Sequence, residues 1–544
     1  MFVRVKRSVA EGRSYEYLQL VRSYREGKRV RQEVLLSLGR KEDLLASGAL
    51  DDLVLSLARH SERLRVVEVA KSLAARSSKS WGPALVFGRL WETQGLPEIL
   101  GSLASKRMFE FDLERVAFAM ALQRLCRPGS DLQGFGWAPT VEAPGLDAIQ
   151  LQHFYRTAGF LASVREELET RLFFKDRDLF DRTLDLVFLD TTSTYVYRDT
   201  ETPMRKRGYS RDRMAECPQL VLCVAVDGEG WPVAWQILPG NTADHEGLRR
   251  MVAALRERFQ IRRAVVVADR GMISKDGISL LEDHATAPFD YVLGCRMRRQ
   301  KEVNEEVLGR AGRYETVDET LAVKEVGVGD HRYVICLNRS EAVKDAFARE
   351  AILEKLRATL SRNGPKAVVG NKGFSRFLKV ARGSVTIDEK AVQRDARLDG
   401  KYVLRTNTDL PAAEVATTYK SLWRVERCFR TTKSTLEVRP IFHHHDDTSI
   451  GHIVGCFLAL RLEVDLQRRL DKAEVEVSWP DLMRDLAQVQ AVTVDLDGKR
   501  YRLRTDLRGA AGKAFAAAGV RPPSAVEPLG PAPPEVAVKS DEEV

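Results

Sequence analysis

The stretch Leu-Asp-Leu-Val-Phe-Leu-Asp-Thr-Thr, residues 184–192, is an apolar run that ends in the carboxylate of Asp190. A second run, Val-Val-Val-Ala-Asp, has the same form and ends at Asp269. Short apolar runs bounded by turn residues predict buried β-strands. Ligand and metal sites of α/β sheets lie at the ends of such strands. We therefore expect the two aspartates either to form a metal-binding pair or to cap the turns that follow them.

The segments around these runs predict a mixed α/β sheet. Strand patterns over 220–226 and 231–238 flank the turn Asp227-Gly228-Glu229-Gly230, which favours a β-hairpin. A helical pattern over 244–259 precedes the strand of Asp269, and another strand pattern follows at 291–295. Strands that alternate with helices are typical of an α/β fold.

A third acidic residue lies in a predicted helix near residue 426. Tyr419, Glu426 and Lys433 are spaced seven residues apart, and seven residues return an α-helix to within about 20° of the same face. One stripe would then present a phenol, a carboxylate and an ammonium group. The alternative from this helix alone is an ordinary surface helix whose polar side chains face solvent.

The excess positive charge is concentrated near the N-terminus. The chain has 86 Lys+Arg and 77 Asp+Glu, a net charge of +9. Residues 1–41 alone hold eleven basic and four acidic residues, a net charge of +7. Their strand patterns predict a small antiparallel sheet that binds DNA through basic side chains, with a solvated basic face as the alternative. The basic residues at the predicted turn are Arg25, Lys28, Arg29 and Arg31.

Composition excludes several classes of protein. A chain of 544 residues with 44% hydrophobic and 30% charged residues is long and apolar enough for several folded domains. The seven cysteines include no C-x-x-C pair, which favours a reducing cytoplasm. The N-terminus has no apolar signal region, and the run 453–462 is shorter than the roughly 20 residues of a membrane span. We expect a soluble cytoplasmic protein without a membrane partner.

Pattern changes along the chain predict six segments. They are a basic β-rich DNA-binding segment (1–45), an all-α DNA-binding region (46–180), the first part of the α/β core (181–297), a β-rich insertion (298–408), the second part of the core with the Glu426 helix (409–490), and a C-terminal extension with a disordered proline-rich acidic tail (491–544).

Taken together, these residues resemble the DDE transposases of bacterial insertion sequences. The order of Asp190, Asp269, a β-rich interruption and Glu426 is similar to the order in that family. The helix resembles the Tyr-x2-Arg-x3-Glu-x6-Lys signature of insertion-sequence family four, in its branch of longer transposases. The phrases Gly208-Tyr209-Ser210, Leu238-Pro-Gly-Asn-Thr242 and Ala268-Asp-Arg-Gly271 add to a resemblance that covers roughly residues 1–490.

The resemblance implies a fold, an activity and a set of site residues. The fold would be a ribonuclease-H-like core, with Asp190, Asp269 and Glu426 as catalytic ligands of two Mg²⁺ or Mn²⁺ ions. Tyr419 and Lys433 would contact DNA. Leu422 stands where the signature has Arg, so that phosphate contact would be absent or moved to Arg424. The protein would bind the inverted terminal repeats as a homodimer, cleave them and join their 3′ ends to target DNA.

The chemistry of the residues agrees with this family. Two metal ions held by carboxylates stabilise the attacking and leaving oxygens of a phosphodiester, and ligand sets of oxygen alone suit Mg²⁺ or Mn²⁺. A catalytically silent DNA-binding relative and a ribonuclease-H-like nuclease or resolvase remain alternatives. The run His443-His444-His445-Asp446-Asp447 is interpreted as a surface or DNA-facing loop.

Overall fold

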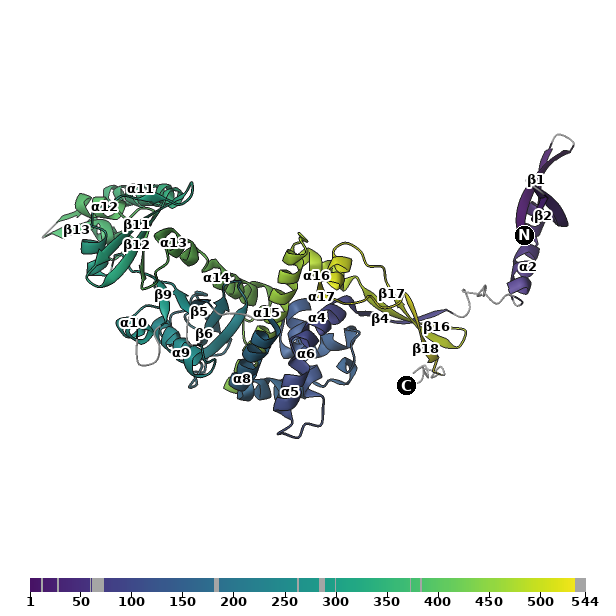
Figure 1. Cartoon of the computed structure of the whole chain (residues 1–544), viewed down its shortest axis with the longest axis horizontal. Coiled ribbons are helices and arrows are strands. Elements are labelled where there is room, and N and C mark those ends of the chain that lie inside the picture. Colours follow the sequence, from purple (N-terminus) through teal and green to yellow (C-terminus); the bar gives the residue numbers. More distant parts are fainter. Residues whose placement is uncertain are drawn as a thin grey trace. The chain divides into compact units, whose positions relative to one another are not determined.

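The chain folds into two compact units (Figure 1). The computed structural model describes residues 1–10, 13–26, 29–58, 60, 73–180, 185–261, 264–282, 289–298, 300–371, 373–381 and 384–533. The first unit is drawn from Met1–Ser77, Thr493–Arg502 and Val526–Val544. The second unit is drawn from Ser78–Val492 and Leu503–Ala525.

The N-terminal part of the first unit is a three-stranded antiparallel sheet, as predicted. Its strands follow the order β1-β2-β3 and are joined to two short helices. Among its described residues, Leu18 and Val21 are buried, so most side chains of the sheet face solvent. Lys28 of the predicted turn lies outside the described residues. The elements are β1 Phe2–Ala10, β2 Arg13–Glu26, β3 Arg29–Arg40, α1 Lys41–Ala46 and α2 Ala49–Ala58.

A nine-stranded mixed sheet organises the second unit. Its order is β10-β11-β12-β15-β9-β8-β5-β6-β7. Strand β8 pairs in parallel with β5 and β9, and the other pairs are antiparallel. The sheet confirms the predicted mixed α/β class. Its strands are β5 Leu186–Tyr195, β6 Gln219–Asp227, β7 Pro232–Pro239, β8 Val265–Ala268, β9 Asp290–Gly294, β10 Glu315–Thr316, β11 Leu321–Val328, β12 His331–Asn338 and β15 Lys401–Thr406.

The sheet separates two hydrophobic cores. Alternate residues of β6 point to opposite faces, so Leu222 and Val224 join one core while Val221 and Cys223 join the other. The first face is covered by α8, α14 and α15, which come from both halves of the chain, and α4 and α6 pack against α15 (Figure 1). The second face is covered by α9 Asp244–Glu257 and α10 Lys275–Leu281. Helices that contribute residues to the first core include α4 Gly82–Thr93, α5 Leu96–Ala104, α6 Leu113–Cys126, α7 Asp131–Trp137, α8 Leu151–Phe180, α14 Trp423–Arg430 and α15 Asp446–Lys472.

The predicted hairpin is confirmed by the pairing of β6 with β7. The carboxylate of Asp227 accepts hydrogen bonds from the backbone N–H groups of Glu229 at 2.8 Å and Trp231 at 2.9 Å. Gly230 has φ of 83°, a conformation that glycine adopts without a steric penalty. Local turn chemistry therefore sets this connection.

Two segments differ from their predicted character. Region 46–180 is interrupted by β4 Ala74–Ser80, and its helices from α4 onward share one hydrophobic core with the sheet in the second unit. In the predicted β-rich insertion 298–408, β15 pairs with β9, so strands of this segment extend the core sheet. This segment also contains α11 Arg339–Asn363, α12 Glu389–Ala396, β13 Leu378–Ala381 and β14 Ser384–Ile387.

The C-terminal region is more ordered than expected. Strand β18 lies inside the proline-rich stretch that was predicted to be disordered, and it pairs in a sheet of order β18-β17-β16-β4. The acidic end at 541–543 lies outside the described residues. No helix of the described ranges is long and apolar enough to cross a membrane. The remaining elements are α13 Ala412–Lys420, α16 Trp479–Ala487, β16 Gln490–Leu496, β17 Lys499–Arg504, α17 Ala511–Ala518 and β18 Val526–Pro531.

The close contact between α8 and α15 can be tested by substituting a glycine on α15. A Cβ atom at Gly451 would lie 1.9 Å from the carbonyl oxygen of Ala158, whereas one at Gly455 would meet nothing closer than Met120 Cε at 3.9 Å. Gly451→Ala should lower the free energy of unfolding by about 1–3 kcal/mol because it overpacks a tight contact. Gly455→Ala on the same helix is the control, and it should not destabilise the protein. Urea denaturation measures both, and equal effects would contradict the assigned crossing.

Candidate active site

The pairing of β5 with β8 sets Asp190 beside Asp269. Leu189 lies opposite Ala268 in this parallel pair, so the two aspartates are the next residues on neighbouring strands. Phe188 belongs to the core on the face of α14. Because side chains alternate along a strand, Asp190 points to that same face.

The two strands end differently. Strand β8 ends at Ala268, directly before Asp269, as the sequence predicts. Strand β5 continues to Tyr195, so the prediction that it ends at Asp190 is wrong. The reason is that residues 190–195 remain paired with β6 on the other side of β5.

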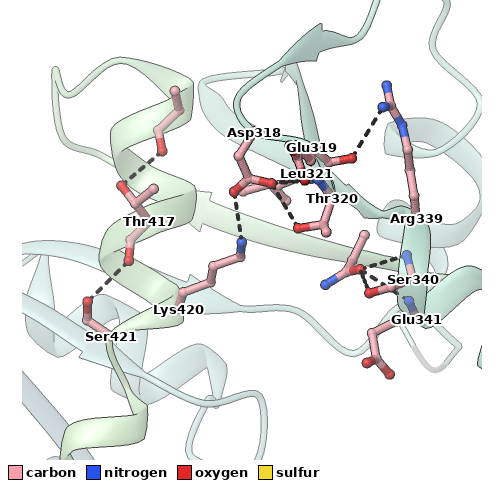
Figure 2. Close-up of polar contacts among 12 residues, drawn as sticks. Asp318, Glu319, Thr320, Leu321, Arg339, Ser340, Glu341, Thr417, Lys420 and Ser421 are labelled. Atoms are coloured by element: carbon pink, nitrogen blue, oxygen red, sulfur yellow. Dashed lines mark hydrogen bonds and ion pairs between the residues drawn. The ribbon is translucent and has the colours of Figure 1, made fainter.

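The predicted continuous helix through Tyr419, Glu426 and Lys433 is wrong. Helix α13 ends at Lys420, α14 covers Trp423–Arg430, and a π-helical turn covers Thr431–Thr435. At the break, the Ser421 hydroxyl donates to the carbonyl oxygen of Thr417 at 3.3 Å (Figure 2). Such bonds from a side chain to the preceding turn bend helices. The three polar residues therefore do not share one straight stripe.

The break nevertheless brings the acidic side chains together. Asp190, Asp269 and Glu426 line one pocket of about 380 Å³, together with Tyr419. Asn338 and Tyr402 of the 298–408 segment also line it, and sequence analysis did not identify either in this role. The full lining is Asp190, Asp269, Asn338, Tyr402, Tyr419, Lys420, Leu422, Trp423, Val425 and Glu426.

Tyr419 holds one carboxylate of the pocket in place. Its hydroxyl donates a hydrogen bond to Asp269 Oδ1 at 2.7 Å. Burial raises the pKa of the Tyr419 phenol, and the charge of Asp269 raises it further, so the phenol remains a donor. A Cβ atom at Gly294 would lie 2.3 Å from this hydroxyl, so the approach requires glycine on β9.

The carboxylate of Asp190 is crowded and largely removed from solvent. Burial raises its pKa to about 6; the charges of Asp269 and Asp244 act in the same direction, and Arg211 opposes them. The Asp190 carboxylate accepts a hydrogen bond from the backbone N–H of Thr191 at 2.7 Å. Mutual repulsion of carboxylates in one pocket favours a bound cation.

Arg211 and Asp244 flank Asp190 and were missed by sequence analysis. A guanidinium nitrogen of Arg211 donates to Asp244 Oδ1 and to Thr191 Oγ1, both at 2.9 Å. Another lies 3.8 Å from Asp190 Oδ1. Arg211 directly follows the phrase Gly208-Tyr209-Ser210, and Asp244 lies two residues after the phrase that ends at Thr242. Their closeness to these phrases is the sequence feature that could have identified them.

The two basic residues predicted to contact DNA from this region do not line the pocket. The Lys433 ammonium donates to Asp212 Oδ1 at 2.9 Å, and Arg439 pairs with the other Asp212 oxygen at 3.0 Å. The guanidinium of Arg424 lies 5.2 Å from the centre of the Trp423 ring. Both cations are thus held by neighbouring side chains of the protein.

The segment 298–408 contacts α13 at the edge of the pocket. The Lys420 ammonium pairs with Asp318 Oδ2 at 3.4 Å (Figure 2). The other oxygen of Asp318 accepts from the hydroxyl and backbone N–H of Thr320, and these bonds hold the pKa of Asp318 at about 2. Asn338, which lines the pocket, caps α11 by accepting from the backbone N–H groups of Ser340 and Glu341 at 3.1 Å.

The charged residues at the predicted N-terminal turn lie in the first unit. Arg25, Arg29 and Arg31 are exposed at the ends of β2 and β3, while Lys28 lies outside the described residues. Arg7 and Arg22 of the same sheet are ion-paired with Glu16 and Glu33.

A second cluster of potential metal ligands lies away from the acidic pocket. Asp131, His443 and His452 are buried, with ligand atoms within 4.8 Å of one another. The surface-loop interpretation is therefore wrong for His443, although His444 and His445 are exposed. A nitrogen of Arg124 lies 3.1 Å from His452 Nδ1 and 4.0 Å from Asp131, so an internal cation already balances the carboxylate. We interpret this cluster as a structural network.

The donor set of the acidic pocket fits a hard divalent cation. Asp190, Asp269 and Glu426 supply carboxylate oxygens from two strands and one helix. Mg²⁺ and Mn²⁺ prefer such ligands. Fold and pocket together define the class of protein as an α/β enzyme with a carboxylate centre.

Comparison with known proteins identifies the family. Residues 181–462, more than half of the chain, match the transposase DDE domain, and residues 3–72 match the N-terminal domain of IS1634 family transposases. The chain therefore belongs to the DDE transposase family, whose members are metal-dependent DNA transposases. No curated protein matches the sequence. A solved structure described as a piggyBac transposase synaptic complex with hairpin DNA aligns with 10% identity, a TM-score of 0.39, and coverage of 75% of this chain and 79% of that chain.

The role of Asp212 as the counter-ion of Lys433 and Arg439 can be tested by mutation. Its side chain is 8% exposed and balances both Lys433 and Arg439. Asp212→Asn should lower the free energy of unfolding by about 3 kcal/mol because it leaves buried cations without a counter-charge. Asp147→Asn is the control, since Asp147 is 67% exposed in its pair with Lys79 and should lose less than about 1 kcal/mol. Similar losses in urea denaturation would show that Asp212 is not an internal counter-ion.

Proposed function

We propose that this protein is the transposase of a bacterial insertion sequence, which binds the inverted terminal repeats, cleaves them and joins their 3′ ends to target DNA. The observation that supports this most directly is the meeting of Asp190, Asp269 and Glu426 in one pocket. The order of these residues along a mixed sheet and a following helix supports a ribonuclease-H-like core interrupted by segment 298–408. The signature of insertion-sequence family four, at Tyr419, Glu426 and Lys433, belongs to this proposal.

In this proposal the three carboxylates of the pocket are the metal ligands. Asp190, Asp269 and Glu426 would hold two Mg²⁺ or Mn²⁺ ions, which supply charge stabilisation for the attacking and leaving oxygens of the phosphodiester. Tyr419 fixes the orientation of Asp269 through its hydrogen bond of 2.7 Å. Arg211, 3.8 Å from Asp190, offers a guanidinium to a phosphate that enters beside the pocket.

DNA is the partner that the charges favour. The exposed arginines of the N-terminal sheet would bind double-stranded DNA at the terminal repeats. Lys433 and Arg424 would reach DNA only by leaving Asp212 and the Trp423 ring. We further propose that the protein acts in the cytoplasm as a homodimer on DNA.

Two other functions would also fit some of these features. A catalytically silent relative would bind the terminal repeats without cutting them, and the presence of all three acids favours catalysis. A nuclease or resolvase with the same core would cut without preference for terminal repeats. The N-terminal unit with its exposed basic residues favours recognition of specific ends. Footprinting on the DNA that flanks the gene distinguishes these functions.

Each of the three carboxylates should be required for DNA cleavage. Glu426→Gln, Asp190→Asn and Asp269→Asn should each abolish Mg²⁺-dependent nicking of a terminal-repeat duplex while leaving its binding within about twofold, because they change the ion-binding oxygens and not the N-terminal sheet. Glu414→Gln is the control, since Glu414 lies on the neighbouring helix α13 and does not line the pocket. Nicking by Glu426→Gln at the wild-type rate would remove Glu426 from the triad.

If the N-terminal sheet binds DNA, its basic residues should contribute to the salt dependence of the binding constant. Replacing Arg25, Lys28, Arg29 and Arg31 by Gln should reduce the slope of log K against log salt by about 0.9 for each phosphate that is no longer neutralised. Replacing Arg7 and Arg22 by Gln is the control, because these residues are ion-paired with Glu16 and Glu33. Fluorescence anisotropy across a salt series measures the slopes. An unchanged slope in the first variant would leave only a solvated basic face.

A further inference from the structure

We propose that a shallow hollow on the outer face of α8 binds the sugar-phosphate backbone of duplex DNA. The hollow has a volume of about 730 Å³, and we call it the α8 surface. Arg107, Arg156 and Arg165 line it together with the carboxylate of Asp447, and Arg165 is ion-paired with Glu166 at 3.4 Å. The inference rests on the proposed function, because it assigns a further contact with the same DNA substrate.

Two of its arginines have no counter-ion within the described part of the chain. The side chains of Arg107 and Arg156 are exposed, and in that part neither forms an ion pair or a side-chain hydrogen bond. Arg171, on the same helix α8, shows the contrast. It pairs with Glu167 at 2.5 Å and donates to Ser102 Oγ at 2.8 Å. The α8 surface therefore retains positive charge that other parts of the helix neutralise.

Aromatic rings hold these arginines in position. The guanidinium of Arg107 lies 5.4 Å from the ring centre of Phe160, and that of Arg156 lies 5.2 Å from the ring centre of Phe111. Phe109 joins the two supports, because its ring contacts those of Phe160 at 5.4 Å and Phe111 at 5.5 Å. Stacking on a ring restricts a guanidinium and leaves its N–H donors free for phosphate oxygens. The cations are thus preorganised without being neutralised.

The single carboxylate at this surface is already used by the protein. Asp447 Oδ1 accepts the backbone N–H of Thr448 at 2.7 Å in the first turn of α15. A carboxylate there interacts favourably with the positive end of the helix dipole. Its charge is therefore partly compensated within the helix, and the net field of the α8 surface remains positive.

The shape and composition of the surface favour an extended polyanion. The exposed Tyr155 contributes a hydroxyl group beside the arginines, and Met108 at the tip of the adjoining loop is 98% exposed. Phosphate contacts by Arg and Tyr position a protein on duplex DNA without reading its sequence. An open surface with several separated cations matches phosphates repeated along a strand better than it matches one small anion.

One residue of the α8 surface is shared with a second cavity. Tyr155 also lines a second cavity of about 980 Å³, which Arg198 and Arg439 border. Arg439 pairs with Asp212, the residue next to Arg211, whose guanidinium faces Asp190. Phosphates bound at the α8 surface would therefore lie next to this second cavity.

The test uses the full-length protein and two matched double variants. The probe is a fluorescein-labelled duplex taken from the DNA that flanks the gene, titrated across a potassium chloride series without divalent ions. Arg107→Gln with Arg156→Gln should reduce the slope of log K against log salt by about 2, since each phosphate that is no longer neutralised lowers it by about 0.9. The control, Arg89→Gln with Arg171→Gln, removes ion-paired arginines and should leave the slope unchanged.

A third variant separates charge from folding. Arg107→Lys with Arg156→Lys keeps both charges and should keep the wild-type slope, and thermal melting checks that all variants are folded. An unchanged slope in the folded Gln variant would overturn the inference and would point to an acidic protein or no partner at this surface. If that occurs while Glu426→Gln still abolishes nicking, only the α8 surface fails. If the wild-type protein neither binds nor nicks the duplex, the proposed function fails with it.

Discussion

The parallel pairing of β5 with β8 is the constraint on which the site depends. It places Leu189 opposite Ala268 and so delivers Asp190 and Asp269 side by side on one face of the sheet. A shift by one residue would send a carboxylate into the opposite core, because strand side chains alternate between faces. The buried residues on both sides of these strands fix the register, since each face is filled by its own core.

The third carboxylate depends on the helical layer and not on the sheet. Glu426 reaches the pocket because the chain breaks between α13 and α14 and α14 then packs on β5 and β6. Val425, Cys428 and Phe429 are the buried residues that anchor that short helix. The layer beneath combines α8 from the first half of the chain with α15 from the second, so distant sequence segments support one site.

Buried carboxylates in this region have cationic side chains close to them. Burial and neighbouring carboxylates raise the pKa of Asp190 to about 6, and Arg211 offsets part of this effect. Asp212 balances Lys433 and Arg439 in the same way, with a carboxylate between two cations. Internal counter-ions of this kind offset the cost of burying charged groups.

The sequence by itself determined several strands of the core sheet, the hairpin at Asp227 and the two aspartates that follow apolar runs, because alternation, turn residues and apolar runs are local signals. The resemblance of residues 419–433 to the family signature also predicted Glu426 as the third acid. Only the tertiary structure decided that α13 and α14 are separate, that β15 joins the core sheet through β9, and that Lys433 meets Asp212. It also decided that Arg211, Asn338 and Tyr402 lie at the site. These features arise from contacts between residues far apart in the chain, and a local sequence pattern does not specify which distant side chain will neutralise a charge or complete a sheet edge.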